Sequence, residues 1–302
     1  MNAFSRSWRL VKASLSVIRA DKELLLFPLI SGAALLGVGL LFLLPLLAAG
    51  IGDTVMRGGE LSNRQGILTA IITFLMYLVN YTIIIYFNTG LVGAAMIRLR
   101  GGDPTFQDGI KLANSRMPQI LGYAAIAATV GFFLNMLSSS ARDSSNPVAR
   151  IGGSIVTGLL GLAWSVLTFL VVPVLVVEEL GPIEAIKRSG ALLRKTFGEQ
   201  IVGNFGIGLV FGLLMLVAML LIGLPLILIG ASMNAPAVVI GGIVFAIVVM
   251  AVIGMLSSAV NSIYAAAVYR YAADGATGDF FEADMVREAF KPKRGVRPGF
   301  SM

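Results

Sequence analysis

Long uninterrupted apolar runs dominate the hydrophobic pattern of the chain. A helix that crosses a bilayer needs about 20 apolar residues, and six longer runs contain no Asp, Glu, Lys, Arg or His. Because the runs are continuous rather than alternating, they predict transmembrane helices and not barrel strands. The expected spans are Phe27–Ile51, Gly66–Ile97, Met117–Leu137, Ile151–Val177, Gln200–Gly230 and Pro236–Tyr269. Pro45, Pro173 and Pro225 lie inside spans and should kink them.

Amphipathic segments precede the first, third and fifth spans. Phe4, Trp8, Val11, Leu15 and Ile18 are spaced to share one helical face, and similar rows precede the other two spans. These rows are Phe106, Ile110, Ala113 and Met117, then Ile183, Ile186, Gly190, Leu193 and Phe197. We therefore expect an all-α membrane protein with one polytopic domain over residues 1–302. Three pseudo-repeats, each an amphipathic cytoplasmic helix plus a helical hairpin, would cover residues 1–100, 101–180 and 181–270, followed by a cytoplasmic tail at 271–302.

Lys and Arg are distributed unevenly between the two ends of the expected spans. Of 23 such residues, 19 lie before the first span, in the second and fourth loops, or after the last span. By the positive-inside rule both termini are then cytoplasmic. The net charge is +7. Because the basic residues that produce it flank membrane spans, we expect no nucleic-acid partner. A cleaved signal peptide is disfavoured, because 26 residues precede the first apolar run and the run is too long.

The basic amphipathic segments are the first candidate site. Helices of this kind lie in the headgroup layer, with apolar faces toward the bilayer and cations toward anionic lipid. The alternative, and the commoner role, is that they anchor loops and fix orientation. The headgroup candidates are Trp8, Arg9, Lys12, Arg19, Lys111, Arg116, Lys187, Arg188, Arg194 and Lys195.

Asparagines within the spans are a second set of candidates. In a membrane they can form interhelical hydrogen bonds or line a cavity, and the packing role is the commoner one. Gly208 and Gly212 form a GxxxG pair, which is weak evidence for self-association, so a homo-oligomer or an unknown protein partner stays open. The candidates for packing or a polar cavity are Asn80, Asn88, Asn135, Asn204 and Asn261.

Catalytic and metal-binding chemistry has little support in the sequence. The chain has no Cys and no His, which removes the usual zinc ligands, the thiolate nucleophile and the commonest general base. No Walker A or dinucleotide motif follows a strand, so we expect no cofactor, no metal and no enzymatic activity. Asp103, Asp108, Glu178 and Glu179 offer a cation site as an alternative, but carboxylates beside Lys and Arg are usually solvated caps.

Four segments carry a family resemblance. They are SWRLVKASLSVIRADKELLLFPL at 7–29, FNTGLVGAAMIRLRGGDPTFQDGIKLA at 87–113, AWSVLTFLVVPVLVVEELGPIEAIKRSGALLRKTFGE at 163–199, and VYRYAADGATGDFF with REAFKPK between 268 and 293. They resemble an uncharacterised family of prokaryotic six-span integral membrane proteins. The resemblance implies a compact helical domain in the prokaryotic cell (inner) membrane, and it implies no activity. A looser resemblance links the chain to the membrane domain of glycerophosphodiester phosphodiesterases, but their catalytic domain is absent.

Three functions follow in order of preference. The first is a non-enzymatic scaffold or lipid-interacting protein of the cytoplasmic leaflet, with membrane lipids, especially anionic ones, as partners. The second is a facilitator or transporter for a lipid or a small solute, which should have a polar cavity across the bilayer midplane. The third is an intramembrane enzyme, which should bring carboxylates together at a cleft.

Overall fold

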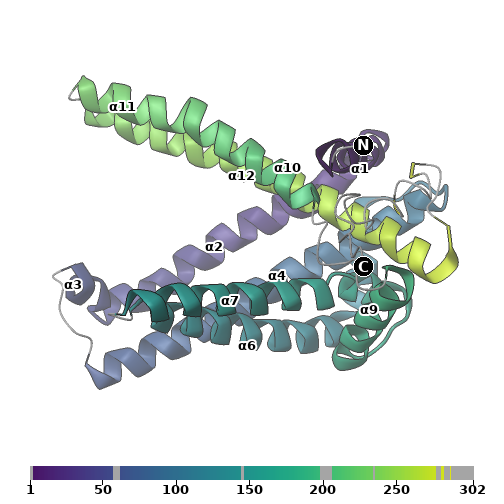
Figure 1. Ribbon diagram of the computed structural model, residues 1–302, viewed down its shortest axis with the longest axis horizontal. Coiled ribbons are helices and arrows are strands. Elements are labelled where there is room, and N and C mark those ends of the chain that lie inside the picture. The colour runs from purple at the N-terminus through teal and green to yellow at the C-terminus, as the bar shows by residue number, and fades with distance from the viewer. Residues whose placement is uncertain are drawn as a thin grey trace, which may run out of the picture.

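The computed structural model describes residues 3–56, 62–143, 146–197, 206–233, 235–276, 280–281 and 286 (Figure 1). Its regular structure in these ranges is helical, as predicted. Six stretches of the described chain are long and apolar enough to cross a membrane, and each matches an expected span: Lys22–Ala48, Asn63–Leu99, Met117–Arg142, Pro147–Val177, Val210–Gly230 and Ala237–Asp274. The protein is therefore a multi-pass membrane protein.

The first hairpin follows the N-terminal amphipathic helix α1 (Ala3–Ala20) and a 3-10 turn, η1 (Lys22–Leu25). Its helices are α2 (Leu26–Ala48) and α4 (Asn63–Leu99), with the short α3 (Ile51–Met56) after α2. Ser62 starts α4 with a reciprocal capping box, because its hydroxyl accepts from the Gln65 N–H while the Gln65 side chain accepts from the Ser62 N–H. At 37 residues, α4 is about 55 Å long and extends beyond the hydrocarbon core.

The second hairpin contains a break that the hydropathy pattern does not reveal. It comprises α5 (Phe106–Ser115), α6 (Met117–Arg142), α7 (Pro147–Leu167) and α8 (Val171–Val177). The expected fourth span was a single kinked helix, but it is interrupted at residues 168–170. Pro173 explains the position, because proline lacks an N–H and its ring clashes with the carbonyl four residues earlier, which suits only the first turn of a new helix.

The third hairpin follows α9 (Pro182–Phe197) and comprises α10 (Gly206–Ala218), the π-helical turn η3 (Met219–Gly223), α11 (Leu224–Ser232) and α12 (Pro236–Asp274). Pro225 is the second residue of α11, just after the π turn, where the regular hydrogen-bond ladder is already altered. Gln200, the expected start of the fifth span, lies outside the described residues. The last helix continues four residues into the expected tail and ends at Gly275, whose φ of 73° is the left-handed conformation that glycine adopts readily.

The hairpins converge at one end of the molecule, which we call the basic end. Helices α1 and α9 lie there with the last turns of α4 and α12, and the α10–α12 hairpin diverges from the others toward the opposite end (Figure 1). Fully buried side chains concentrate at the basic end, and they include Val17, Leu91, Leu175, Leu193 and Ile263. Toward the opposite end, leucines such as Leu36 and Leu40 are about 70% exposed. This apolar exterior is the surface that a bilayer would cover.

Candidate functional site

Arg98, in the last turn of α4, connects three segments at the basic end. Its Nε donates to Asp21 Oδ2 at 2.5 Å, and its Nη2 donates to Asp103 Oδ1 at 2.5 Å. The Arg98 and Asp21 side chains are only 18% and 9% exposed, whereas that of Asp103 is 91% exposed. Nearby, Glu23 accepts a hydrogen bond from the backbone N–H of Phe106. Carboxylates that follow α1 therefore fix the end of α4 and the start of α5.

A second charged cluster holds α9 against its neighbours. Glu178 accepts from Arg188 Nε at 2.8 and 2.9 Å and from the Tyr269 hydroxyl at 2.9 Å. The adjacent Glu179 pairs with Arg116, and its φ of 55° is in the left-handed region, which costs a non-glycine residue energy. The two neighbouring carboxylates thus bind Arg116, at the turn that starts α6, and Arg188 of α9, and the Tyr269 hydroxyl adds a link to α12.

The alternative cation site is absent from the described part of the chain. Three of its proposed ligands, Asp103, Glu178 and Glu179, are ion-paired with arginines. Asp108 caps α5, where hydrogen bonds from the Thr105 hydroxyl and backbone N–H hold the pKa of the Asp108 carboxyl below its usual value. No group of three or more Asp, Glu, His or Cys side chains suited to a metal ion occurs among the described residues.

The structure divides the predicted headgroup candidates into paired and unpaired cations. Arg116 and Arg188 bond to glutamates, and Lys111 lies 3.9 Å from the Asp108 carboxylate. Arg9 is half-buried. Trp8 is 42% exposed, and its ring lies 5.8 Å from Lys12 Nζ, within range of a cation–π contact. The exposed cations that form no ion pair with another described residue are Lys12, Arg19, Lys187, Arg194 and Lys195.

The apolar faces of the amphipathic helices differ from the expectation. In α1 the buried face includes Val11 and Ile18 of the expected row together with Leu10, Ser14 and Val17, and it packs against α10 and α12, while Trp8 is exposed. The Phe4 side chain lies outside the described residues. In α5 and α9 the residues packed against the protein include Ala113, Ala185 and Leu192. Protein, rather than acyl chains, therefore covers much of these apolar faces, because the three helices pack against the converging spans.

The asparagine candidates have different environments. Asn88 receives an interhelical hydrogen bond from the Ser262 hydroxyl at 3.5 Å, as expected for packing. Asn261 instead donates to the Ser257 carbonyl of its own helix at 2.9 Å. Asn80 is half-buried, and its Oδ1 has no hydrogen-bond partner among the described residues. Asn135 is exposed on the surface of α6, and its role in packing or in a cavity stays a prediction. Asn204 lies outside the described residues.

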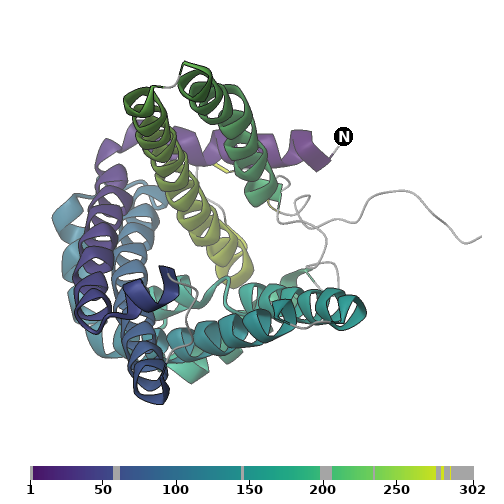
Figure 2. The same cartoon turned by 90° about the vertical axis from the view of Figure 1, so that its left-hand side faces the viewer.

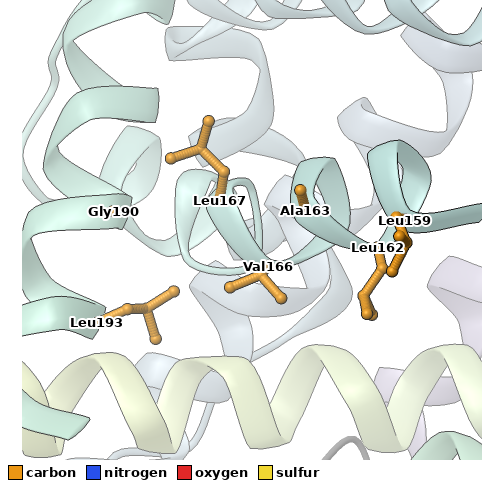
Figure 3. Close-up of a pocket in the computed structure, with 7 residues that line it drawn as sticks. All are labelled: Leu159, Leu162, Ala163, Val166, Leu167, Gly190 and Leu193. Carbon is orange, nitrogen blue, oxygen red and sulfur yellow. The ribbon is translucent and has the colours of Figure 1, made fainter. Parts of the chain in front are cut away.

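Cavities open between helices in the described part of the chain. One, of about 590 Å³, lies between α2, α4 and α12, and its lining is apolar except for Ser31, Asn88 and Ser258. Another, of about 400 Å³, lies between α7 and α9 and is lined only by Leu, Val, Ala and Gly (Figure 3). Both are within the size range of small-molecule sites. Their apolar walls suit hydrocarbon rather than a soluble polar ligand.

A family model matches residues 67–281. The chain belongs to the family of unknown function DUF6159. This confirms that the protein is a member of an uncharacterised family, and the matched region of the DUF6159 protein runs from α4 to beyond α12, through the charged clusters around Arg98 and Glu178. No curated protein matches the chain. The looser likeness to phosphodiesterase membrane domains stays an expectation.

Proposed function

We propose that this DUF6159 protein is a non-enzymatic membrane scaffold that binds anionic lipid headgroups in the leaflet at its basic end. The supporting observation is the set of exposed cations on α1 and α9 that form no ion pair with a described carboxylate: Lys12, Arg19, Lys187, Arg194 and Lys195. The carboxylates nearest to the converging spans are occupied by other arginines. The outward-facing charge at this end is therefore strongly positive.

The energetics favour lipid as the partner of these cations. Each Lys or Arg close to an anionic bilayer surface contributes roughly 1 kcal/mol, and the attraction decays within a Debye length. Several such side chains on one leaflet select anionic lipid around the protein without any catalytic group. Trp8 adds an amphipathic ring of the kind enriched at the interface.

A matched pair of triple variants tests this function. Lys12, Arg19 and Lys195 change to Gln in one variant, and Arg64, Arg142 and Arg150, exposed at the opposite end, change to Gln in the other. Both lose three charges. Native mass spectrometry of protein purified from mixed zwitterionic and anionic phospholipid should show fewer anionic lipids retained by the first variant only. The difference from the parent protein should shrink as salt screens the parent's cations. Equal retention by both variants would refute the proposal.

The orientation is part of the same proposal. The excess of Lys and Arg favours a cytoplasmic location of the basic end in a prokaryotic inner membrane. Because the chain contains no Cys, single cysteines at the exposed Ser62 and Ser115 report each side directly. An impermeant thiol reagent added outside cells should label Ser62→Cys and not Ser115→Cys. The reverse pattern would place the basic end outside.

A second candidate function is movement of a lipid or a solute through the cavity between α2, α4 and α12. Its polar lining from Ser31, Asn88 and Ser258 favours an amphiphile over an ion. A fluorescent-phospholipid translocation assay in proteoliposomes tests this function, with Asn88→Leu as the inactive variant. Absence of translocation by the unaltered protein would leave the scaffold as the better proposal. An intramembrane enzyme has less support, because the predicted carboxylates bind arginines or cap a helix.

A further inference from the structure

The cavity between α7 and α9 has an apolar wall of unusual regularity. Five residues of α7 line it at spacings that place them on one helical face, and two residues of α9 close it at the basic end (Figure 3). The described part of α7 contains no buried side chain, and its Leu159 is 61% exposed on this face. The lining residues are Leu159, Leu162, Ala163, Val166, Leu167, Gly190 and Leu193.

Two features of α9 keep the basic end of this cavity open and fixed. Gly190 has no side chain, and a Cβ added there would lie 2.8 Å from Leu167 Cδ1. Ser189, which is fully buried, accepts a hydrogen bond from the backbone N–H of Leu170 at 3.1 Å. That bond ties α9 to the turn that follows α7. The cavity is therefore preformed, and a larger residue at position 190 would occupy it.

Cations stand beside the apolar opening. Lys187 and Arg194 lie three residues before and four residues after Gly190, so all three share one side of α9. Both cations are exposed and form no ion pair within the described residues. Glu178 binds Arg188, and the exposed Glu184, three residues before Lys187 on α9, forms no ion pair with either cation. An apolar cavity with two such cations at its α9 end is complementary to a molecule with a hydrocarbon tail and an anionic head.

The surrounding architecture leaves the site accessible from the bilayer. Figures 1 and 2 show that α7 and the α10–α12 hairpin lie apart over most of their length. An apolar helix from another protein could cover the α7 face, but it would leave Lys187 and Arg194 without counter-charge. An amphiphile satisfies both parts of the surface. The charge complementarity therefore favours a lipid over a protein partner.

We propose that the cavity binds an acyl chain of one anionic phospholipid, whose headgroup phosphate is held by Lys187 and Arg194. The inference rests on the proposed function and narrows it to a single site with a defined ligand class. The lipid tail lies along the Leu159–Leu167 face of α7, and the head lies at α9. Lipids attracted only by surface charge would exchange readily, whereas this lipid should persist through detergent washing.

The test fills the cavity without changing charge. Gly190→Leu places a side chain in the cavity from α9, and Ala163→Phe does so from α7, so the two do not share a folding defect. Gly161→Leu is the control, because Gly161 lies on the opposite face of α7, where a Cβ would meet nothing within 4 Å. Native mass spectrometry after detergent exchange should show retained phosphatidylglycerol reduced about tenfold by either filling variant and unchanged by the control. The double variant K187Q/R194Q should lose the preference for phosphatidylglycerol over phosphatidylcholine.

The outcomes separate this site from general charge attraction. If both filling variants retain phosphatidylglycerol while the triple Gln variant at Lys12, Arg19 and Lys195 loses it, the site is refuted and the scaffold function stands. If the filling variants and K187Q/R194Q lose the lipid while Gly161→Leu keeps it, the site is supported. If every variant retains the lipid at all salt concentrations, both proposals fail.

Discussion

At the crossing of α4 and α5, replacing a glycine with alanine should lower the free energy of unfolding, although alanine has the higher helix propensity. Gly90 and Gly109 face each other at the crossing. A Cβ on Gly109 would lie 2.6 Å from the Gly90 carbonyl oxygen and 2.4 Å from Phe27 Cζ. The Phe27 ring, which is 1% exposed, is held between the two helices and also lies 4.7 Å, between ring centroids, from Phe106. Gly109→Ala therefore requires a shift of backbone and not only of a side-chain end.

The magnitude follows from two opposing contributions. In an unconstrained helix, Gly→Ala stabilises by about 1 kcal/mol. Extra methyl groups in a well-packed core destabilise by about 1–3 kcal/mol, and contact with a backbone oxygen places Gly109→Ala at the upper end of that range. The net change in the free energy of unfolding should be a loss of about 2 kcal/mol. Gly161→Ala, where nothing lies within 4 Å of the new methyl group, should instead gain about 0.5–1 kcal/mol.

Equilibrium unfolding in mixed micelles with a denaturing detergent measures both variants against the parent protein. The reasoning requires opposite signs, because the same chemical change meets backbone at one position and open space at the other. If Gly109→Ala stabilises the protein as much as Gly161→Ala, the close crossing of α4 and α5 is wrong. Since α5 carries Lys111 and leads to Arg116, such a result would also change the placement of the basic end.

Three further changes test the charged clusters and the interhelical bond. Asp21→Asn removes the buried partner of Arg98 and should lower the free energy of unfolding by about 2 kcal/mol. Asp103→Asn removes an exposed partner of the same arginine and should lower it by less than about 1 kcal/mol. Equal losses would contradict the argument from burial. Thr105→Ala removes the α5 cap and should cost about 1 kcal/mol. The Thr105 hydroxyl bond to Asp108 lowers the pKa of that carboxyl, so the stability it adds is present above the unfolded pKa and lost as the pH falls through the folded pKa. The difference between this variant and its parent should therefore narrow in acid, while the part from the bond that the Thr105 hydroxyl accepts from the Asp108 N–H remains. Asn88→Leu should cost about 0.6 kcal/mol in micelle unfolding, and a gain in stability would exclude the interhelical bond.

The spans could be predicted from sequence because each residue contributes to hydropathy independently of its partners. The consequences of the prolines were less accessible. All were expected to kink helices, but Pro173 lies in the first turn of a new helix, which begins at Val171 after a three-residue interruption, and Pro225 follows a π turn. Which outcome occurs depends on how neighbouring helices satisfy the freed carbonyl groups, and that is a tertiary property.

The role of the amphipathic faces was harder to predict, because periodicity reports that a face is apolar but not what covers it. Trp8 was expected on the lipid-immersed face of α1 and is instead exposed beside Lys12, while Leu10 and Val17 are buried by protein. Long-range ion pairs were missed entirely. Arg98 and Asp21 are 77 residues apart in sequence, and nothing local marks them as partners.

The number of Lys and Arg residues at the basic end indicates topology, but fewer of them are free to contact lipid. The chemistry of the two side chains helps to explain which ones are not. Arg98, Arg116 and Arg188 bind carboxylates, and Arg270 donates to the backbone carbonyl of Leu99. A planar guanidinium with several fixed donors suits such contacts between helices, whereas the lysine ammonium is a compact, strongly hydrated charge on a flexible stem. Accordingly, Arg98, Arg116, Arg188 and Arg270 hold the basic end together, and the outward cations are three lysines, Lys12, Lys187 and Lys195, together with Arg19 and Arg194.

This division gives the basic end two functional layers. The inner arginines set the positions of α5, α9 and the ends of α4 and α12, and that framework fixes where the outer cations of α1 and α9 stand relative to the bilayer. Removal of an inner arginine should therefore disturb lipid binding only through loss of structure, while removal of an outer cation should weaken lipid binding with little change in stability. Measured on the same variants, lipid retention and unfolding free energy should therefore fall together when an inner arginine is removed, whereas only lipid retention should fall when an outer cation is removed.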